Sequence, residues 1–232
     1  MNIDNSYKSI INLTLVLLLF YCSNLFVYIP INLFNIDINN CGNVVYSLVV
    51  FFPNIILATF LFFFYRKDLK NDFKEFMDKV GDFTDIAFKN WLLGYMLMVV
   101  SNFLIMTLSP LEIAENEQSV RTLISISPVI SFIFAAFVGP FVEEMIFRKA
   151  FKDAIVSKWA FILISGIVFG ALHVIDSITS FYDLLYIIPY SCLGIFFAKA
   201  YYDTNNIFSS ISMHVFHNFM TIMLLFISSG GI

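Results

Sequence analysis

Long apolar runs, separated by short polar segments, fill almost the whole chain. Runs close to the ~20 residues that a helix needs to cross the hydrocarbon core fall at about 9–34, 43–65, 91–109, 123–147, 159–176, 184–201 and 207–228. The first and fourth runs are long enough to tilt or break, so the pattern predicts about seven spans, or eight if one of them divides. The predicted fold class is therefore all-α, a polytopic transmembrane helical bundle.

Composition excludes an ordinary soluble domain. The 232 residues are 59% hydrophobic and 13% charged, with a mean hydropathy of +0.84, whereas soluble domains carry about 25% charged residues. The length suits a single membrane domain over 1–232, which we divide into N-terminal spans in 1–122 and a catalytic core in 123–228. The lipid bilayer is an expected partner, and nucleic acid is not.

The segment 66–90 is the most basic part of the chain. Its apolar positions recur mostly every three or four residues, and its basic residues are Arg66, Lys67, Lys70, Lys74, Lys79 and Lys89. That spacing predicts an amphipathic helix, and basic amphipathic helices lie in the membrane surface. We therefore expect 66–90 to form a surface helix on the cytoplasmic side.

The other loops set the expected orientation. The segment 148–158 is also basic, whereas 35–43 and 176–183 hold no lysine or arginine and 110–122 holds Arg121 alone. Cytoplasmic loops carry the excess of basic residues, so the N-terminus is predicted inside and the C-terminus outside. The first apolar run lacks a small-x-small cleavage site and is expected to stay as a span. Abundant phenylalanine and isoleucine are common in AT-rich genomes, so we expect a bacterial cytoplasmic membrane.

Ionisable side chains inside the predicted spans are the first candidates for a functional site, because charges in hydrocarbon are costly. Glu143 and Glu144 lie side by side in the fourth run. His173 lies in a later run, and His214 and Asn218 lie in the last one. Three separate spans can therefore bring polar groups to one buried point.

The two glutamates are predicted to have different tasks. Glu144 and Arg148 are four residues apart and share a helix face, and a buried arginine needs a partner, so they are expected to form an ion pair. Glu143 points about 100° away and stays free to hold a water molecule as a general base. A kink at Gly139-Pro140 would open room for that water.

The histidines and asparagine suit the stabilisation of a developing negative charge. His214 and Asn218 are four residues apart on one face, as the donors of an oxyanion hole could be. Gly166 and Gly170 form a G-x-x-x-G pattern that lets helix backbones approach closely, which would carry His173 toward its partners.

Several nearby residues are interpreted as structural. His217 is rotated about 60° from His214 and is predicted to be non-catalytic. Phe147 and Phe169 are expected to pack beside the site. The tyrosines of the sixth run and the loop before it are interpreted as interfacial and packing residues: Tyr182, Tyr186 and Tyr190.

The ordered motifs E-E-x-x-x-R, F-x-x-x-H and H-x-x-x-N, over about 141–218, resemble the CPBP family, the CAAX-protease and bacteriocin-processing (Abi) group of intramembrane proteases. The resemblance implies that Glu143 activates water and His173 positions it. It also implies that His214 and Asn218 stabilise the oxyanion, with Glu144 and Arg148 in support. The N-terminal spans add nothing specific to this resemblance.

The resemblance leaves the cofactor open between a metal-free glutamate mechanism and a zinc enzyme. Glu143, His173 and His214 could ligate zinc with water in the fourth position. The chain has no H-E-x-x-H motif, and an amide is a poor zinc ligand. We therefore favour a site without metal.

The predicted function is an intramembrane endopeptidase that cleaves a small membrane-associated peptide or protein tail. The alternative is a non-catalytic bacteriocin-immunity or partner-binding membrane protein. A proton-coupled transporter is a third class, disfavoured because the chain shows no duplicated half. At ~1.5 Å per residue, Glu143, His173 and His214 lie about 14, 22 and 10 Å from the basic edges, which favours access from the cytoplasmic side.

Overall fold

The computed structural model describes residues 3–109 and 114–228, and the described residues fold as a bundle of helices without strands. Residues 110–113 of the predicted outer loop lie outside the described residues. The main helices are α1 (Ile3–Cys22), α2 (Tyr28–Phe34), α3 (Asn43–Phe64), α4 (Arg66–Asp78), α5 (Val80–Leu108), α6 (Glu115–Ile126), α7 (Pro128–Ile133), α8 (Gly139–Glu144), α9 (Phe151–Ala154), α10 (Lys158–Leu172), α11 (Ile187–Thr204) and α12 (Ile207–Ser228).

Within the described residues, six helical stretches are long and apolar enough to cross a membrane. They are Tyr7–Phe34, Asn43–Phe64, Val80–Leu108, Pro128–Ala154, Phe181–Thr204 and Ile207–Ser228. A seventh apolar helix, α10, is shorter at 15 residues. These seven elements correspond to the seven predicted runs, so the polytopic helical bundle is confirmed, with one element below full spanning length.

The two long runs are irregular, as their length suggested. The first contains the 3-10 segment Ser23–Val27 between α1 and α2. The fourth contains two π-helical segments, Phe134–Val138 and Met145–Ala150, which flank α8. Each irregularity leaves one continuous stretch across the bundle, so neither run divides into two spans.

The predicted surface helix over 66–90 is only partly correct. Helix α4 ends at Asp78, and Lys79 has φ −125 and ψ 26 between the two helices. Residues 80–90 instead begin α5, because Phe83, Ala87 and Asn90 are buried on the face that continues into the bundle. The amphipathic period is the same before and after Lys79, so the pattern alone could not show the break.

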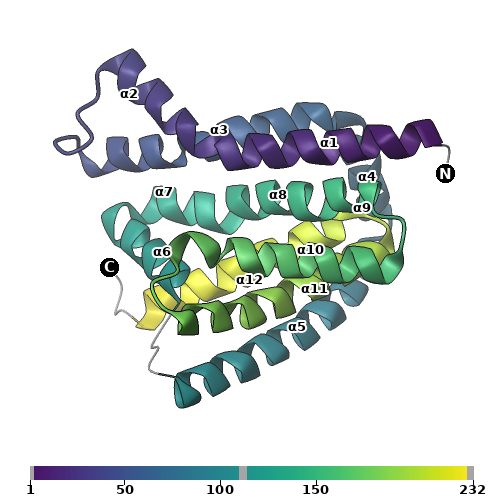
Figure 1. Ribbon diagram of the computed structural model, residues 1–232. Helices are drawn as coiled ribbons and strands as arrows, with labels where there is room; N and C mark the ends of the chain where they lie inside the picture. The colour runs from purple at the N-terminus through teal and green to yellow at the C-terminus, as the bar shows by residue number, and fades with distance from the viewer. Residues whose placement is uncertain (1–2, 110–113, 229–232) are drawn as a thin grey trace.

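Helix α4 is fixed to the start of α12. The amide of Asn206 donates to the backbone carbonyl of Asp72 at 2.7 Å, and the Asp72 carboxylate accepts the Ile207 N–H at 3.2 Å. Burial raises the pKa of the Asp72 carboxyl, against the lowering effect of that N–H. The contact holds the basic helix against the bundle at the end where α9 also lies (Figure 1).

The G-x-x-x-G pattern acts as predicted, between α10 and α11. A Cβ atom on Gly166 would lie 2.5 Å from the backbone nitrogen of Ile195, and one on Gly170 would lie 2.7 Å from that of Ser191. Gly194 meets the same surface from α11, where a Cβ atom on it would lie 2.7 Å from the Gly166 carbonyl oxygen. The two backbones touch because these positions lack side chains.

We predict that Gly166→Ala destabilises the protein by about 1–3 kcal/mol, because the added methyl group overpacks a backbone contact. The thermal unfolding midpoint in detergent should fall. Gly81→Ala is the control, since a Cβ there meets nothing within 4 Å and alanine favours the helix. Equal midpoints for both variants would contradict the α10–α11 contact.

Candidate active site

A π-helical segment just before Pro140 is joined to the last span by a hydrogen bond. The Gly139 N–H donates to Phe134 O, five residues back, so the Ala135 carbonyl would next pair with residue 140. Pro140 has no N–H to give, and the Asn218 side-chain amide donates to Ala135 O at 2.8 Å instead. The expected kink thus takes the form of a π-helical segment, a feature often found at functional sites.

The predicted ion pair between Glu144 and Arg148 is confirmed. Both side chains are 0% exposed, and Arg148 Nε lies 3.2 Å from Glu144 Oε2. The other oxygen of Glu144 accepts from His214 Nδ1 at 2.8 Å. The Ser210 hydroxyl, which sequence reasoning missed, donates to Glu144 Oε2. Glu144 therefore has three polar partners, and two of them, His214 and Ser210, connect the fourth span to α12.

Aromatic rings enclose the arginine. The Arg148 guanidinium lies 4.5 Å from the centre of the Phe169 ring and 5.9 Å from that of Phe197. Within the described residues its nitrogens make no contact with full hydrogen-bond geometry, so charge balance by Glu144 and the ring faces hold it. Phe147, 1% exposed, packs on Phe169 at 5.7 Å between ring centres, as expected of packing residues.

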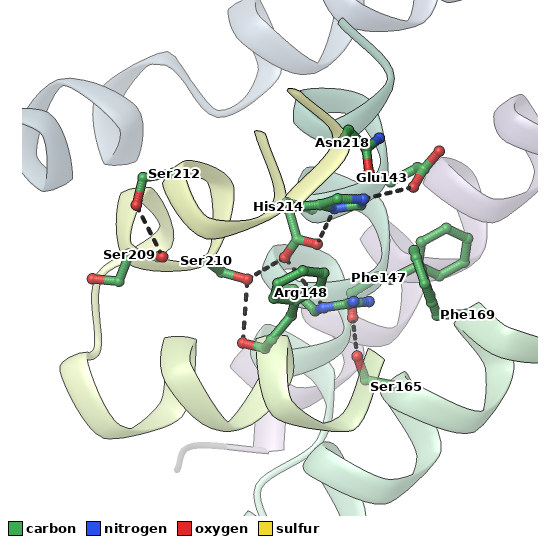
Figure 2. Close-up of polar contacts among 12 residues, drawn as sticks. Glu143, Phe147, Arg148, Ser165, Phe169, Ser209, Ser210, Ser212, His214 and Asn218 are labelled. Carbon is green, nitrogen blue, oxygen red and sulfur yellow. Dashed lines mark hydrogen bonds and ion pairs between the residues drawn. The ribbon is translucent and has the colours of Figure 1, made fainter. Parts of the chain in front are cut away.

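Glu143 points away from this pair toward two histidines. Its Oε2 lies 3.6 Å from His214 Nε2 and 3.8 Å from His173 Nε2, and its side chain is 26% exposed. Figure 2 shows Glu143, His214 and Asn218 around the same point. Both separations exceed a direct hydrogen bond, which is the range in which a water can bridge two polar groups.

The other ring nitrogen of each histidine fixes its orientation. His173 Nδ1 lies 2.8 Å from Phe169 O, and His214 Nδ1 lies 2.8 Å from Glu144 Oε1. A carbonyl or carboxylate oxygen accepts only, so both Nδ1 atoms carry the proton. Both Nε2 atoms are then left to face Glu143.

The structure brings together the side chains predicted for the site. A cavity of about 550 Å³ is lined by Glu143, His173, His214 and Asn218, together with residues from α3, α5, α6 and α11. Among the described residues, no group of three or more His, Cys, Asp or Glu is placed to hold a metal ion. The preference for a site without metal over the zinc set Glu143, His173 and His214 stays a prediction.

Sequence reasoning missed much of the cavity wall. Tyr190, interpreted above as a packing or interfacial residue, lines the cavity and stacks on His173 with 4.9 Å between ring centres. Its hydroxyl accepts from the Asn116 amide at 3.4 Å. Tyr186 also lines the cavity, and the spacing of four residues between the two tyrosines was an available signal. Asn54 and Asn102 gave none, because single amides in apolar runs resemble tolerated packing residues.

His217 also lines the cavity, but it is held by α5. Its Nδ1 accepts from Trp91 Nε1 at 3.4 Å, and its ring meets Tyr95 at 6.0 Å. The ring is thus engaged away from Glu143. The prediction that His217 is non-catalytic stays a prediction.

The expectation of access from the basic end stays a prediction, although the cavity lining extends toward the opposite end of the bundle. The cavity wall includes Met98 and Met106 from the second half of α5 and Asn116 from the start of α6. These parts of the two helices lie toward the end of the bundle opposite α4 (Figure 1). Between the site and the α4 end lies a tightly packed core, each member at most 1% exposed: Ile146, Phe147, Phe161, Ile162 and Ile207. Depth from the basic edge depends only on the number of residues in a helix, so it could not show which end of the bundle is filled by packed side chains.

Comparison with known proteins finds similarity over the segment that carries these side chains. Residues 125–220 match the family described as type II CAAX prenyl endopeptidase Rce1-like. A Bacillus subtilis protein named "Putative membrane peptidase YdiL" is 34% identical over 116 residues, covering 48% of this chain and 44% of that protein. An uncharacterized Mycoplasma capricolum protein is 24% identical over 209 residues, covering 85% of this chain and 61% of that protein. No solved structure was found to match.

Fold and comparisons define a multi-pass membrane protein with a segment similar to membrane proteases. The matched segment 125–220 carries the three motifs, and its similarity to the CAAX prenyl endopeptidase family model agrees with the resemblance noted from the sequence. The chain spans about half the length of the curated relatives it matches.

The adjacent glutamates allow a matched prediction about stability. Glu144→Gln should destabilise the protein by about 3–5 kcal/mol, because it leaves the buried charge of Arg148 unpaired. Glu143→Gln should leave the thermal midpoint in detergent nearly unchanged, since Glu143 faces a cavity. A larger loss for Glu143→Gln than for Glu144→Gln would contradict the assignment of the structural pair.

Proposed function

We propose that the protein is an intramembrane endopeptidase in which Glu143 activates the attacking water. The observation that carries the proposal is the position of Glu143 Oε2 between the Nε2 atoms of His214 and His173, at 3.6 and 3.8 Å. One carboxylate and two oriented ring nitrogens thus meet at a wall of a peptide-sized cavity. A general base must lie within hydrogen-bond reach, directly or through one water molecule, of the proton that it removes, and Glu143 can meet this requirement.

In the proposed first step, a water lies between Glu143 and His173. Neutral His173 accepts one water hydrogen at Nε2, which orients the oxygen. Glu143 takes the other proton as the oxygen attacks the scissile carbonyl carbon, and the carbonyl electron pair moves onto its oxygen. The negative charge of Glu143 thus passes to the tetrahedral intermediate.

His214 and Asn218 stabilise that oxyanion in the proposed mechanism. His214 acts as an imidazolium, donating from Nε2 to the oxyanion while Nδ1 donates to Glu144. Asn218 uses one amide hydrogen on Ala135, so its second hydrogen is the one available. The intermediate then collapses: the oxyanion re-forms the carbonyl, the C–N bond breaks, and Glu143 gives its proton to the leaving amine.

The proposed setting is the cytoplasmic membrane of a bacterium, with the N-terminus inside. The substrate is a small membrane-associated peptide or protein tail, such as a peptide pheromone or a bacteriocin leader. Prenylated substrates are not expected in a bacterial host, although the matched family is described as a prenyl endopeptidase.

We predict that Glu143→Gln lowers kcat at least 100-fold, because general-base catalysis is worth about 10²–10⁴-fold. The assay compares secreted and membrane peptides by mass spectrometry in a deletion strain restored with wild type or variant at equal expression. His217→Gln is the control and should restore processing. If Glu143→Gln restores the wild-type peptide profile, water activation by Glu143 is wrong. A bacteriocin-immunity phenotype that survives the variant would favour the binding function.

We also predict that activity does not depend on zinc. Purified protein treated with a chelator should keep its activity, and elemental analysis should find far less than one zinc per chain. Loss of activity on chelation, with recovery on adding zinc, would overturn the metal-free mechanism.

A further inference from the structure

The lysines and arginines divide the bundle into two unlike ends. All 13 of them lie in the described residues, and every one except Arg121 lies on or nearest the end that holds α4, α9 and the start of α1 (Figure 1). Arg121 itself is paired with Glu117 in α6. Because cytoplasmic segments carry the basic excess, the α4 end is the cytoplasmic one.

From the proposed catalytic side chains, the cavity extends away from the α4 end of the bundle. Glu143, Phe197 and His214 form its deep end, while Asn116, Glu117 and Tyr186 lie at the start of α6 and before α11. Those segments belong to the end opposite α4. On the cytoplasmic side, the ion pair of Glu144 and Arg148, both 0% exposed, and the apolar core beneath it close the bundle.

The wall chemistry limits what this cavity can accept. Among the described residues, no lysine or arginine lines it, and its acidic lining groups are Glu143 and Glu117. Amides from separate elements, Asn54, Asn102 and Asn116, can pair with peptide backbone groups. Apolar surface fills most of the rest, with Phe51, Met98, Met106, Phe134 and Leu193. Acidic side chains would meet like charge in a low-dielectric wall, where repulsion is strong.

Depth limits the shape of the substrate. Fifteen residues separate Pro128, at the far end, from Glu143, or about 22 Å at a rise of ~1.5 Å per residue. An extended peptide covers ~3.3 Å per residue, so about six or seven residues would reach the carboxylate. A folded domain would not fit a cavity of about 550 Å³.

We propose that the site opens on the extracytoplasmic face and receives an extended, apolar, non-acidic peptide segment that has already crossed the membrane. This inference deepens the proposed function and rests on it for cleavage, but the direction of opening stands on the charge distribution and the packing alone. The substrate is therefore supplied by export across the membrane, and its cleavage follows translocation.

The direction of opening can be tested without any activity assay. Cys22, Cys41 and Cys192 are free and would be replaced by serine. Single cysteines are then introduced as Asn116→Cys in the cavity wall and Lys74→Cys on exposed α4. A membrane-impermeant maleimide on intact cells should label Asn116→Cys at least tenfold faster than Lys74→Cys, with both labelled after permeabilisation. Faster labelling of Lys74→Cys would overturn the proposal.

Cleavage is tested with right-side-out and inside-out membrane vesicles. The probes are quenched-fluorescent decapeptides with sulfonated dyes, apolar at the centre and flanked by lysine or by glutamate. Right-side-out vesicles should cleave the lysine set at least tenfold faster than inside-out vesicles, and Glu143→Gln vesicles should cleave neither. Cleavage confined to inside-out vesicles would overturn the inference and leave the protease intact. If Asn116→Cys is labelled faster on intact cells but neither kind of vesicle cleaves the probes, the proposed function and its substrate are overturned. The extracytoplasmic opening would still be supported.

A matched pair of glutamates tests the exclusion of acidic peptides. Glu117→Gln should narrow the preference for lysine over glutamate probes several-fold, because Glu117 lines the cavity. Glu115→Gln is the control, since Glu115 lies on the same helix but outside this cavity. If Glu117→Gln shows the same preference for lysine probes over glutamate probes as the wild type, charge repulsion by Glu117 does not exclude acidic peptides.

Discussion

A carboxylate buried at the centre of the bundle organises the site. Glu144 has no exposed surface and is held by Arg148, His214 and Ser210. A charge in that position is tolerated only when it is fully paired, so the fourth span and α12 must meet in this one register. The same carboxylate fixes the His214 ring and directs its Nε2 atom toward Glu143. Structure and proposed chemistry therefore depend on one interaction.

Irregular helical segments and helix ends position Asn218 and His173. The π-helical turn before Pro140 leaves the Ala135 carbonyl without a backbone donor, and Asn218 supplies one. His173 follows the last residue of α10, where its ring can reach back to the Phe169 carbonyl four residues earlier. Glycines between α10 and α11 let that helix end come close to the site. The Asn218 amide thus donates one hydrogen to the Ala135 carbonyl, and its second hydrogen is the one assigned to the oxyanion in the proposed mechanism.

The cavity combines a region shared with the family and a region outside it. The match covers 125–220 and includes Glu143 and both site histidines. Asn54, Asn102 and Asn116 lie before that region yet line the same cavity. In the proposed function, reaction chemistry and substrate choice can vary separately, because the proposed catalytic groups come from the matched segment and much of the wall comes from α3, α5 and α6.

The sequence alone determined what depends on local spacing. Apolar run lengths predicted the helical bundle, four-residue spacing predicted the Glu144–Arg148 pair, and the order of three motifs predicted the family. Only the tertiary structure decided the break at Lys79, the place of Tyr190 beside His173, and the end of the bundle toward which the cavity lining extends. These features depend on which distant helices pack together and which end of the bundle is filled. Local periodicity contains no information about such contacts, because the same apolar face suits many neighbours.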